Sequence, residues 1–105
     1  MELQELFENA VERPLVVRPG RQDVKIEATN RVMPRWFIKG GGDASILVAS
    51  LKAFDEQDEA DARLLAHAYN HFPALLEAAE QLLAGHAGAK SKLARAVKAA
   101  QKVNV

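Results

Sequence analysis

The sequence predicts an α+β fold, because apolar residues recur at helical spacing near both ends of the chain and at strand spacing between them. Residues 3–11 carry one apolar stripe opposite a row of glutamates, which is typical of an amphipathic helix. Between residues 15 and 52, apolar and polar residues alternate as they do in half-buried strands. From residue 55 onward the spacing is helical again. We therefore expect an N-terminal helix, a small antiparallel β-meander of three to four strands, and two to three C-terminal helices packed on one face of the sheet.

Four short segments of the chain have the alternation of strands. In the second segment Val24, Ile26 and Ala28 fall on one face, and charged residues fall on the other. Pro19 and Gly20 separate the first two segments and predict a hairpin there. The segments comprise residues 15–18, 22–28, 35–39 and 45–52.

The second half of the chain predicts helices whose first turn is acidic. Either Asp55 or Asp58 can cap the first of them. Pro73 either begins a second helix or kinks a continuous one, because proline lacks a backbone donor. Gly85 and Gly88 bracket a break before a last, lysine-rich helix. The residues expected to face the core are Leu64, Leu65, Ala66, Ala68 and Tyr69 in the first helix and Leu93, Val97 and Ala100 in the last.

The length of 105 residues allows one compact domain with a short extension. We expect residues 1–88 to form a single α+β domain and residues 89–105 to form a basic C-terminal helix or tail. The N-terminus is acidic where a secretory signal needs positive charge, and no apolar run reaches the length of a membrane span. A cytoplasmic protein without membrane contact is the expectation.

Charges are balanced in total but segregated along the chain, in four blocks that alternate negative, positive, negative and positive. The boundaries fall near residues 12, 52 and 85. We expect the blocks to neutralise one another within the fold or across an oligomer. Apolar helix surface that a single small sheet leaves uncovered predicts a homodimer.

The sequence contains no catalytic or cofactor motif. Cysteine is absent, which excludes disulfides, thiolate metal sites and cysteine nucleophiles. His67 and His71 are four residues apart on a predicted helix and could reach one metal ion, but the sequence offers no obvious third ligand, so we expect no metal site. Residues 40–42 are glycines that lack the spacing of a phosphate-binding loop and predict a hairpin loop instead. We expect no cofactor and no enzymatic activity.

Two groups of residues are candidates for binding a partner. Arg35, Trp36 and Tyr69 are the first, because arginine and the large aromatic residues are enriched at interface hot spots. Trp36 has two interpretations, since strand alternation allows either core packing or exposure. The second group is the basic C-terminal segment, whose cations have a spacing that could follow nucleic-acid phosphates. It comprises Lys90, Lys92, Arg95, Lys98 and Lys102.

The segment that begins at Asp61 resembles a helical motif of small accessory proteins of tailed bacteriophages and prophages. That motif has Asp or Asn followed by Ala-Arg-Leu, then Pro and Leu-Leu-x-Ala, after a β-rich N-terminal part. The matching residues are Asp61, Ala62, Arg63 and Leu64, then Pro73, Leu75, Leu76 and Ala78. Residues 69–72 are bulkier than the alanines usual in the motif, and the basic tail after Gly85 lies outside it.

The resemblance implies a protein that acts by binding a host protein or a phage protein, for host takeover, for blocking host defence, or for regulation. A nucleic-acid-binding regulator that uses the basic C-terminal helix is the first alternative. A self-assembling structural protein is the second. The sequence leaves the identity of the partner open.

Overall fold

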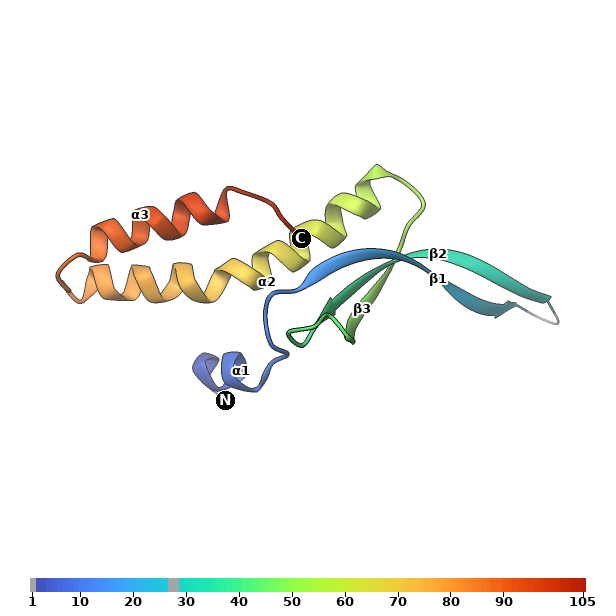
Figure 1. The fold of residues 1–105 in the computed structure, drawn as a ribbon, viewed down its shortest axis with the longest axis horizontal. Helices are drawn as coiled ribbons and strands as arrows, with labels where there is room; N and C mark the ends of the chain where they lie inside the picture. The colour runs from blue at the N-terminus through green and yellow to red at the C-terminus, as the bar shows by residue number, and fades with distance from the viewer. Residues whose placement is uncertain (1, 27–28) are drawn as a thin grey trace. The chain divides into compact units, whose positions relative to one another are not determined.

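The computed structural model describes residues 2–26 and 29–105 and confirms the α+β fold. It has a short N-terminal helix, a three-stranded antiparallel sheet and two C-terminal helices (Figure 1). Ala28, which the sequence places on the apolar face of the second strand segment, lies outside the described residues. The elements in chain order are α1 (Leu3–Asn9), β1 (Val16–Ile26), β2 (Thr29–Gly40), β3 (Ile46–Lys52), α2 (Glu56–Leu83) and α3 (Ala89–Ala100).

Residue contacts group the chain into two compact units. The sheet unit consists of Val11–Ala66 together with Val105, and the helical unit consists of Met1–Ala10 and His67–Asn104. Helix α2 therefore begins in the sheet unit and ends in the helical unit. The predicted boundary at residue 88 remains a prediction.

The sheet is a meander in the order β1-β2-β3, with both pairs antiparallel. The register places Val17 opposite Ile38, and Ile38 opposite Ala49. Val17 and Ile38 are each 2% exposed and belong to one face of the sheet. Trp36 shares that face, because residues two apart along a strand point to the same side. This apolar face is the core of the sheet unit.

The predicted hairpin at Pro19 and Gly20 is wrong, because β1 continues through both residues. An edge strand can accept proline where the missing N–H has no neighbour to bond, so Pro19 does not end β1. Gly20 has a different role: a Cβ atom added to it would lie 2.1 Å from Cε2 of Phe37. The aromatic ring therefore occupies the space above the glycine on the neighbouring strand.

The predicted hairpin loop between β2 and β3 is confirmed. Gly41 and Gly42 have φ angles of 89° and 84°, a conformation that favours glycine. Oδ1 of Asp43 accepts a hydrogen bond from the backbone N–H of Ser45 at 3.1 Å, and the bonds from Ser45 lower the pKa of the Asp43 carboxyl. The side chain of Asp43 thus stabilises a turn within the loop by binding the backbone two residues later.

Helix α2 is continuous, with Pro73 inside it, which decides between the two alternatives left by the sequence. Its predicted core face is wrong in part. Ala62 and Ala66 have no exposed surface, whereas Leu64 is 67% and Leu65 is 56% exposed. The two alanines are one turn apart, so their small side chains form the face that packs closely, and the leucines lie outside it.

The helical unit is built around an antiparallel pair, the later part of α2 and α3. Gly85, with a φ angle of 75°, ends α2 in a Schellman motif: its N–H bonds the carbonyl of Leu82, and the N–H of His86 bonds that of Gln81. The predicted break is therefore confirmed. An ion pair connects the two helices close to this turn: Nζ of Lys92 in α3 lies 3.4 Å from Oε1 of Glu77 in α2.

Helix α3 presents mainly small residues inward. Leu93 and Ala100 are half-buried as predicted, but Val97 is 42% exposed. The inward face instead runs from Ala89 through Leu93 and Ala96 to Ala100, with the four- and three-residue steps of one helix face.

Within the helical unit, an aromatic pair joins helix α1 to α2. The rings of Phe7 and Phe72 meet edge to face, with centroids 5.7 Å apart and planes at 71°. This is a favoured geometry for two aromatic rings.

Replacing Gly20 with alanine tests the packing of Phe37 on β1. The added methyl group overlaps the ring, so we expect Gly20→Ala to lower the free energy of unfolding by about 1–3 kcal/mol in urea denaturation. Without the overlap, alanine would stabilise a strand slightly. The control is Arg21→Ala, which changes an exposed neighbour. Equal stability of the two variants would contradict the packing, and Phe37→Leu should restore part of the loss in Gly20→Ala.

Candidate functional site

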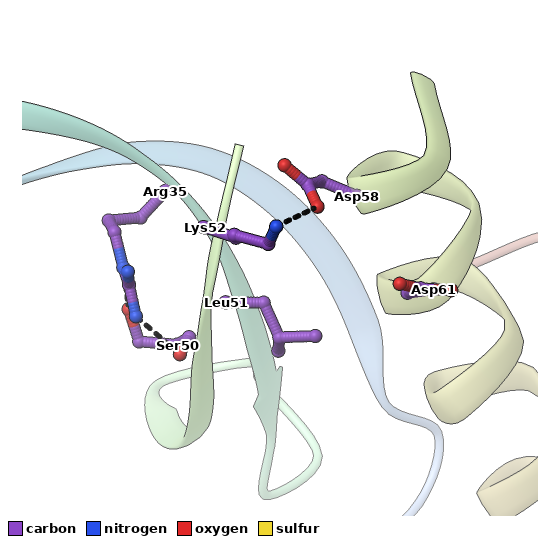
Figure 2. A pocket seen from close by; sticks show the side chains of 6 residues that line it. All are labelled: Arg35, Ser50, Leu51, Lys52, Asp58 and Asp61. Carbon is purple, nitrogen blue, oxygen red and sulfur yellow. Dashed lines mark hydrogen bonds and ion pairs between the residues drawn. The ribbon is translucent and has the colours of Figure 1, made fainter. Parts of the chain in front are cut away.

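A pocket of about 290 Å³ in the sheet unit is formed by β2, β3 and the first turns of α2 (Figure 2). It contains one of the predicted binding residues, Arg35, and two residues of the acidic helix start. Its lining residues are Arg35, Ser50, Leu51, Lys52, Asp58 and Asp61.

Arg35 is held in place by a single residue of the neighbouring strand. Its Nε donates to Oγ of Ser50 at 2.8 Å, and its Nη2 donates to the backbone carbonyl of Ser50 at 2.6 Å. The β2–β3 register places Arg35 opposite Lys52, so two cations stand side by side at this end of the sheet. Within the described part of the chain, Nη1 of Arg35 makes no hydrogen bond. The guanidinium is therefore held in place by Ser50, and the N–H groups of Nη1 can still donate hydrogen bonds to a ligand.

The acidic side of the pocket is built by the cap of α2. Oδ1 of Asp55 accepts the backbone N–H of Asp58 at 2.9 Å, and Oδ2 of Asp58 accepts that of Phe54 at 2.9 Å. The two residues thus share the capping that the sequence allowed to either one, in a reciprocal arrangement similar to a capping box.

Asp58 is charged although it is only 4% exposed. The N–H of Phe54 lowers the pKa of the Asp58 carboxyl, and the charge of Lys52, whose Nζ lies 3.4 Å away, adds to this against the effect of burial. Asp58 is therefore committed to the cap and to Lys52. Asp61, one turn further, is exposed and lines the same pocket.

The pocket therefore has two polar sides of opposite charge. Arg35 can donate hydrogen bonds to a carboxylate or a similar oxyanion. Asp61 can accept from an ammonium or a guanidinium group. A ligand that carries both a negative and a positive group matches the two kinds of side chain in this lining.

Trp36 does not line this pocket. Its half-buried ring lies on the core face, and the guanidinium carbon of Arg63 lies 5.7 Å from the ring centroid. Arg63 also bonds Glu59 at 3.1 Å and the backbone oxygen of Val105 at 2.7 Å. Trp36 is thus half-buried on the core face, between the core packing and the exposure that the sequence allowed. Tyr69, the third predicted contact, is half-buried in the helical unit.

Four of the five predicted phosphate-binding cations are exposed. Lys92 is the exception, because it is half-buried and paired with Glu77. This ion pair and that of Lys52 with Asp58 each join a positive block of the sequence to the negative block between them. The exposed members are Lys90, Arg95, Lys98 and Lys102.

The two histidines of α2 are in contact, with ring centroids 4.3 Å apart. Burial, and next the charge of the nearby His67, lowers the pKa of His71 below 6.5. Among residues 2–26 and 29–105, no group of three or more histidine, aspartate or glutamate side chains is arranged to hold a metal ion. His86 is exposed in the turn before α3.

Sequence reasoning found Arg35 and the acidic helix start but missed Ser50 and Lys52. Both lie in a segment predicted as a strand, two residues apart and hence on one face. What the sequence lacks is the register that sets Lys52 opposite Arg35, because one residue of slip would reverse the face of every side chain.

Comparisons of the chain with protein-family models, with curated proteins and with solved structures found no match. In the described part of the chain, no helix has the length and apolar character needed to cross a membrane.

The cap of α2 gives a testable pH dependence. Because the folded state lowers the pKa of Asp58, the stabilisation is complete above the unfolded-state value of about 3.9 and is lost as the pH falls through the lower folded-state value. We expect the urea midpoint to fall between about pH 5 and pH 2, and to fall less in Asp58→Asn. Asp61→Asn, which changes an exposed carboxylate of the same helix, is the control. An identical pH profile for Asp58→Asn and the native chain would contradict this role.

Proposed function

We propose that this chain is a non-enzymatic accessory protein of the tailed-phage type, which acts in the cytoplasm of a bacterial host by binding a host protein at the pocket around Arg35. The resemblance of the segment from Asp61 onward to the motif of phage accessory proteins supports the proposed phage origin. The pocket around Arg35 supports the proposed mode of action, which is binding of a protein partner.

The observation that carries the proposal is the fixed guanidinium of Arg35. Its two bonds to Ser50 remove side-chain freedom before any ligand arrives, so binding a carboxylate costs less entropy than it would at a mobile arginine. Arginine is also enriched at positions that dominate binding energy. A surface loop of a partner that carries an acidic and a basic side chain would pair with Arg35 and Asp61 respectively.

The chemistry of the pocket supports binding rather than catalysis. General acid–base catalysis needs a group that is free to exchange a proton with a substrate. Asp58 is engaged by Phe54 and Lys52, and its lowered pKa keeps it charged. Ser50 is engaged by Arg35.

A second candidate function is nucleic-acid binding through α3. The specific observation is that Lys90, Arg95 and Lys98 are exposed on a helix that contains no acidic residue, with Lys102 exposed just beyond it. Phosphate binding by these cations would weaken steeply as the salt concentration rises.

Pull-down from bacterial lysate, with and without nuclease, tests the proposed function. We expect the tagged chain to retain one host protein in stoichiometric amount after nuclease treatment, and Arg35→Ala to reduce the retained amount about tenfold or more. Arg31→Ala is the matched control, because Arg31 is an exposed arginine four residues earlier on the same face of β2.

Three outcomes would count against the proposal. Retention of the host protein by Arg35→Ala would remove the pocket from the mechanism. Equal loss in Arg31→Ala would indicate a general charge effect. Nuclease-sensitive capture of nucleic acid alone, lost when residues 89–105 are removed, would favour the second candidate. Circular dichroism of each variant confirms that it is folded.

A further inference from the structure

The histidine pair of α2 has a feature that its spacing alone did not reveal. Nε2 of His67 is hydrogen-bonded to the backbone carbonyl of Ala100, the last residue of α3. A carbonyl oxygen only accepts, so Nε2 must carry the proton. In the neutral ring the lone pair is then on Nδ1.

Nδ1 of His67 is buried and has no hydrogen-bond partner among the described residues. A buried polar atom without a partner costs free energy, and in a native structure it calls for an explanation. The lone pair of an imidazole nitrogen is satisfied either by a hydrogen-bond donor or by a cation. The ring of His71 lies beside that of His67, with centroids 4.3 Å apart.

The arrangement of His67 matches the second-shell geometry of metal-binding histidines. Such a histidine typically donates one ring N–H to a carbonyl or carboxylate, which fixes the tautomer and leaves the other nitrogen to bind the metal. The carbonyl of Ala100 has this place with respect to His67. The bond also joins the ring to the end of α3, so the orientation of the ring is set by the hairpin of α2 and α3.

The spacing of the two rings fits a shared ion. Two imidazoles that bind one zinc ion at about 2.0–2.1 Å, at angles between 90° and 110°, hold their ring centroids roughly 4.5–5.2 Å apart. The centroids of His67 and His71 are 4.3 Å apart, with the ring planes tilted by 49°. A small outward rotation of the His71 ring, which is only half-buried, would open this space.

We propose that Nδ1 of His67 and a ring nitrogen of His71 form a two-histidine site for a divalent cation of borderline softness, such as Zn²⁺. Imidazole nitrogen suits zinc, nickel and copper, and it is a poor ligand for magnesium or calcium. Water that reaches the ion from the side of His71, which is only half-buried, completes the coordination. The ion stabilises the pairing of α2 with α3, because one ligand is already bonded to the end of α3.

Titration with zinc chloride tests the site on the full chain at pH 7.5, after treatment with a chelator. Isothermal calorimetry should give one saturable Zn²⁺ per chain, and magnesium chloride should give no binding. We expect His67→Ala and His71→Ala each to weaken zinc binding at least tenfold. His86→Ala, which removes the exposed histidine of the α2–α3 turn, should bind as the native chain does. Zinc should raise the thermal midpoint of the native chain and of His86→Ala only.

Several results would overturn the proposal. These are the absence of saturable zinc binding by the folded native chain, unchanged affinity in His71→Ala, and loss of binding in His86→Ala. Since His67→Ala also removes the bond to Ala100, His71→Ala is the decisive variant, and circular dichroism shows whether it is folded. Nitrogen NMR of the histidine rings provides a direct check: zinc should shift Nδ1 of His67 and leave its Nε2 protonated.

Discussion

The carboxylate of Asp58 is the interaction on which the sheet unit depends. It accepts the N–H of Phe54 and pairs with Lys52 at the end of β3, while its own N–H bonds Asp55. Asp58 thus links the segment after the last strand to the first turn of α2, and its side chain neutralises a cation of the sheet. The pocket beside it follows from this connection, because the next turn of α2 adds Asp61 to the lining, together with Arg35 from β2.

The inward face of α2 decides what the rest of its surface presents. Because Ala62 and Ala66 are the buried residues, Leu64 and Leu65 are left exposed, and no large side chain within the described residues is completely buried. Three consecutive residues of the edge strand β3 are also about half exposed, namely Ile46, Leu47 and Val48. A chain with so much apolar surface outside its core has physical reason to associate with another surface, and this is consistent with a binding role and with the homodimer that the sequence predicts.

The order and type of the elements could be predicted from the sequence, since they depend on local periodicity and on turn residues. The αL glycine Gly85 and the acidic cap of α2 are local signals of this kind. Gly20 misled the prediction because its function is to make room for Phe37, seventeen positions away in sequence and adjacent only through the register. Ser50 and Lys52 were not predicted as site residues because their place beside Arg35 also depends on the register. The alanine face of α2 was not predicted because hydrophobicity alone favours leucine for the core, whereas close packing favours the smaller side chain.

The two histidines show how one local pattern acquires meaning from a distant residue. Spacing of four along a helix brings His67 and His71 together whatever else the chain does, and by itself it is no stronger than a chance pair. The carbonyl at the end of α3 distinguishes them. A helix leaves its last carbonyls without intrahelical partners, and His67 satisfies one of them with Nε2. Satisfying α3 commits the proton to one side of the ring and leaves a buried lone pair on the other. Packing that completes a helix end thus creates, as a physical consequence, the coordination-ready atom on which the cation site rests.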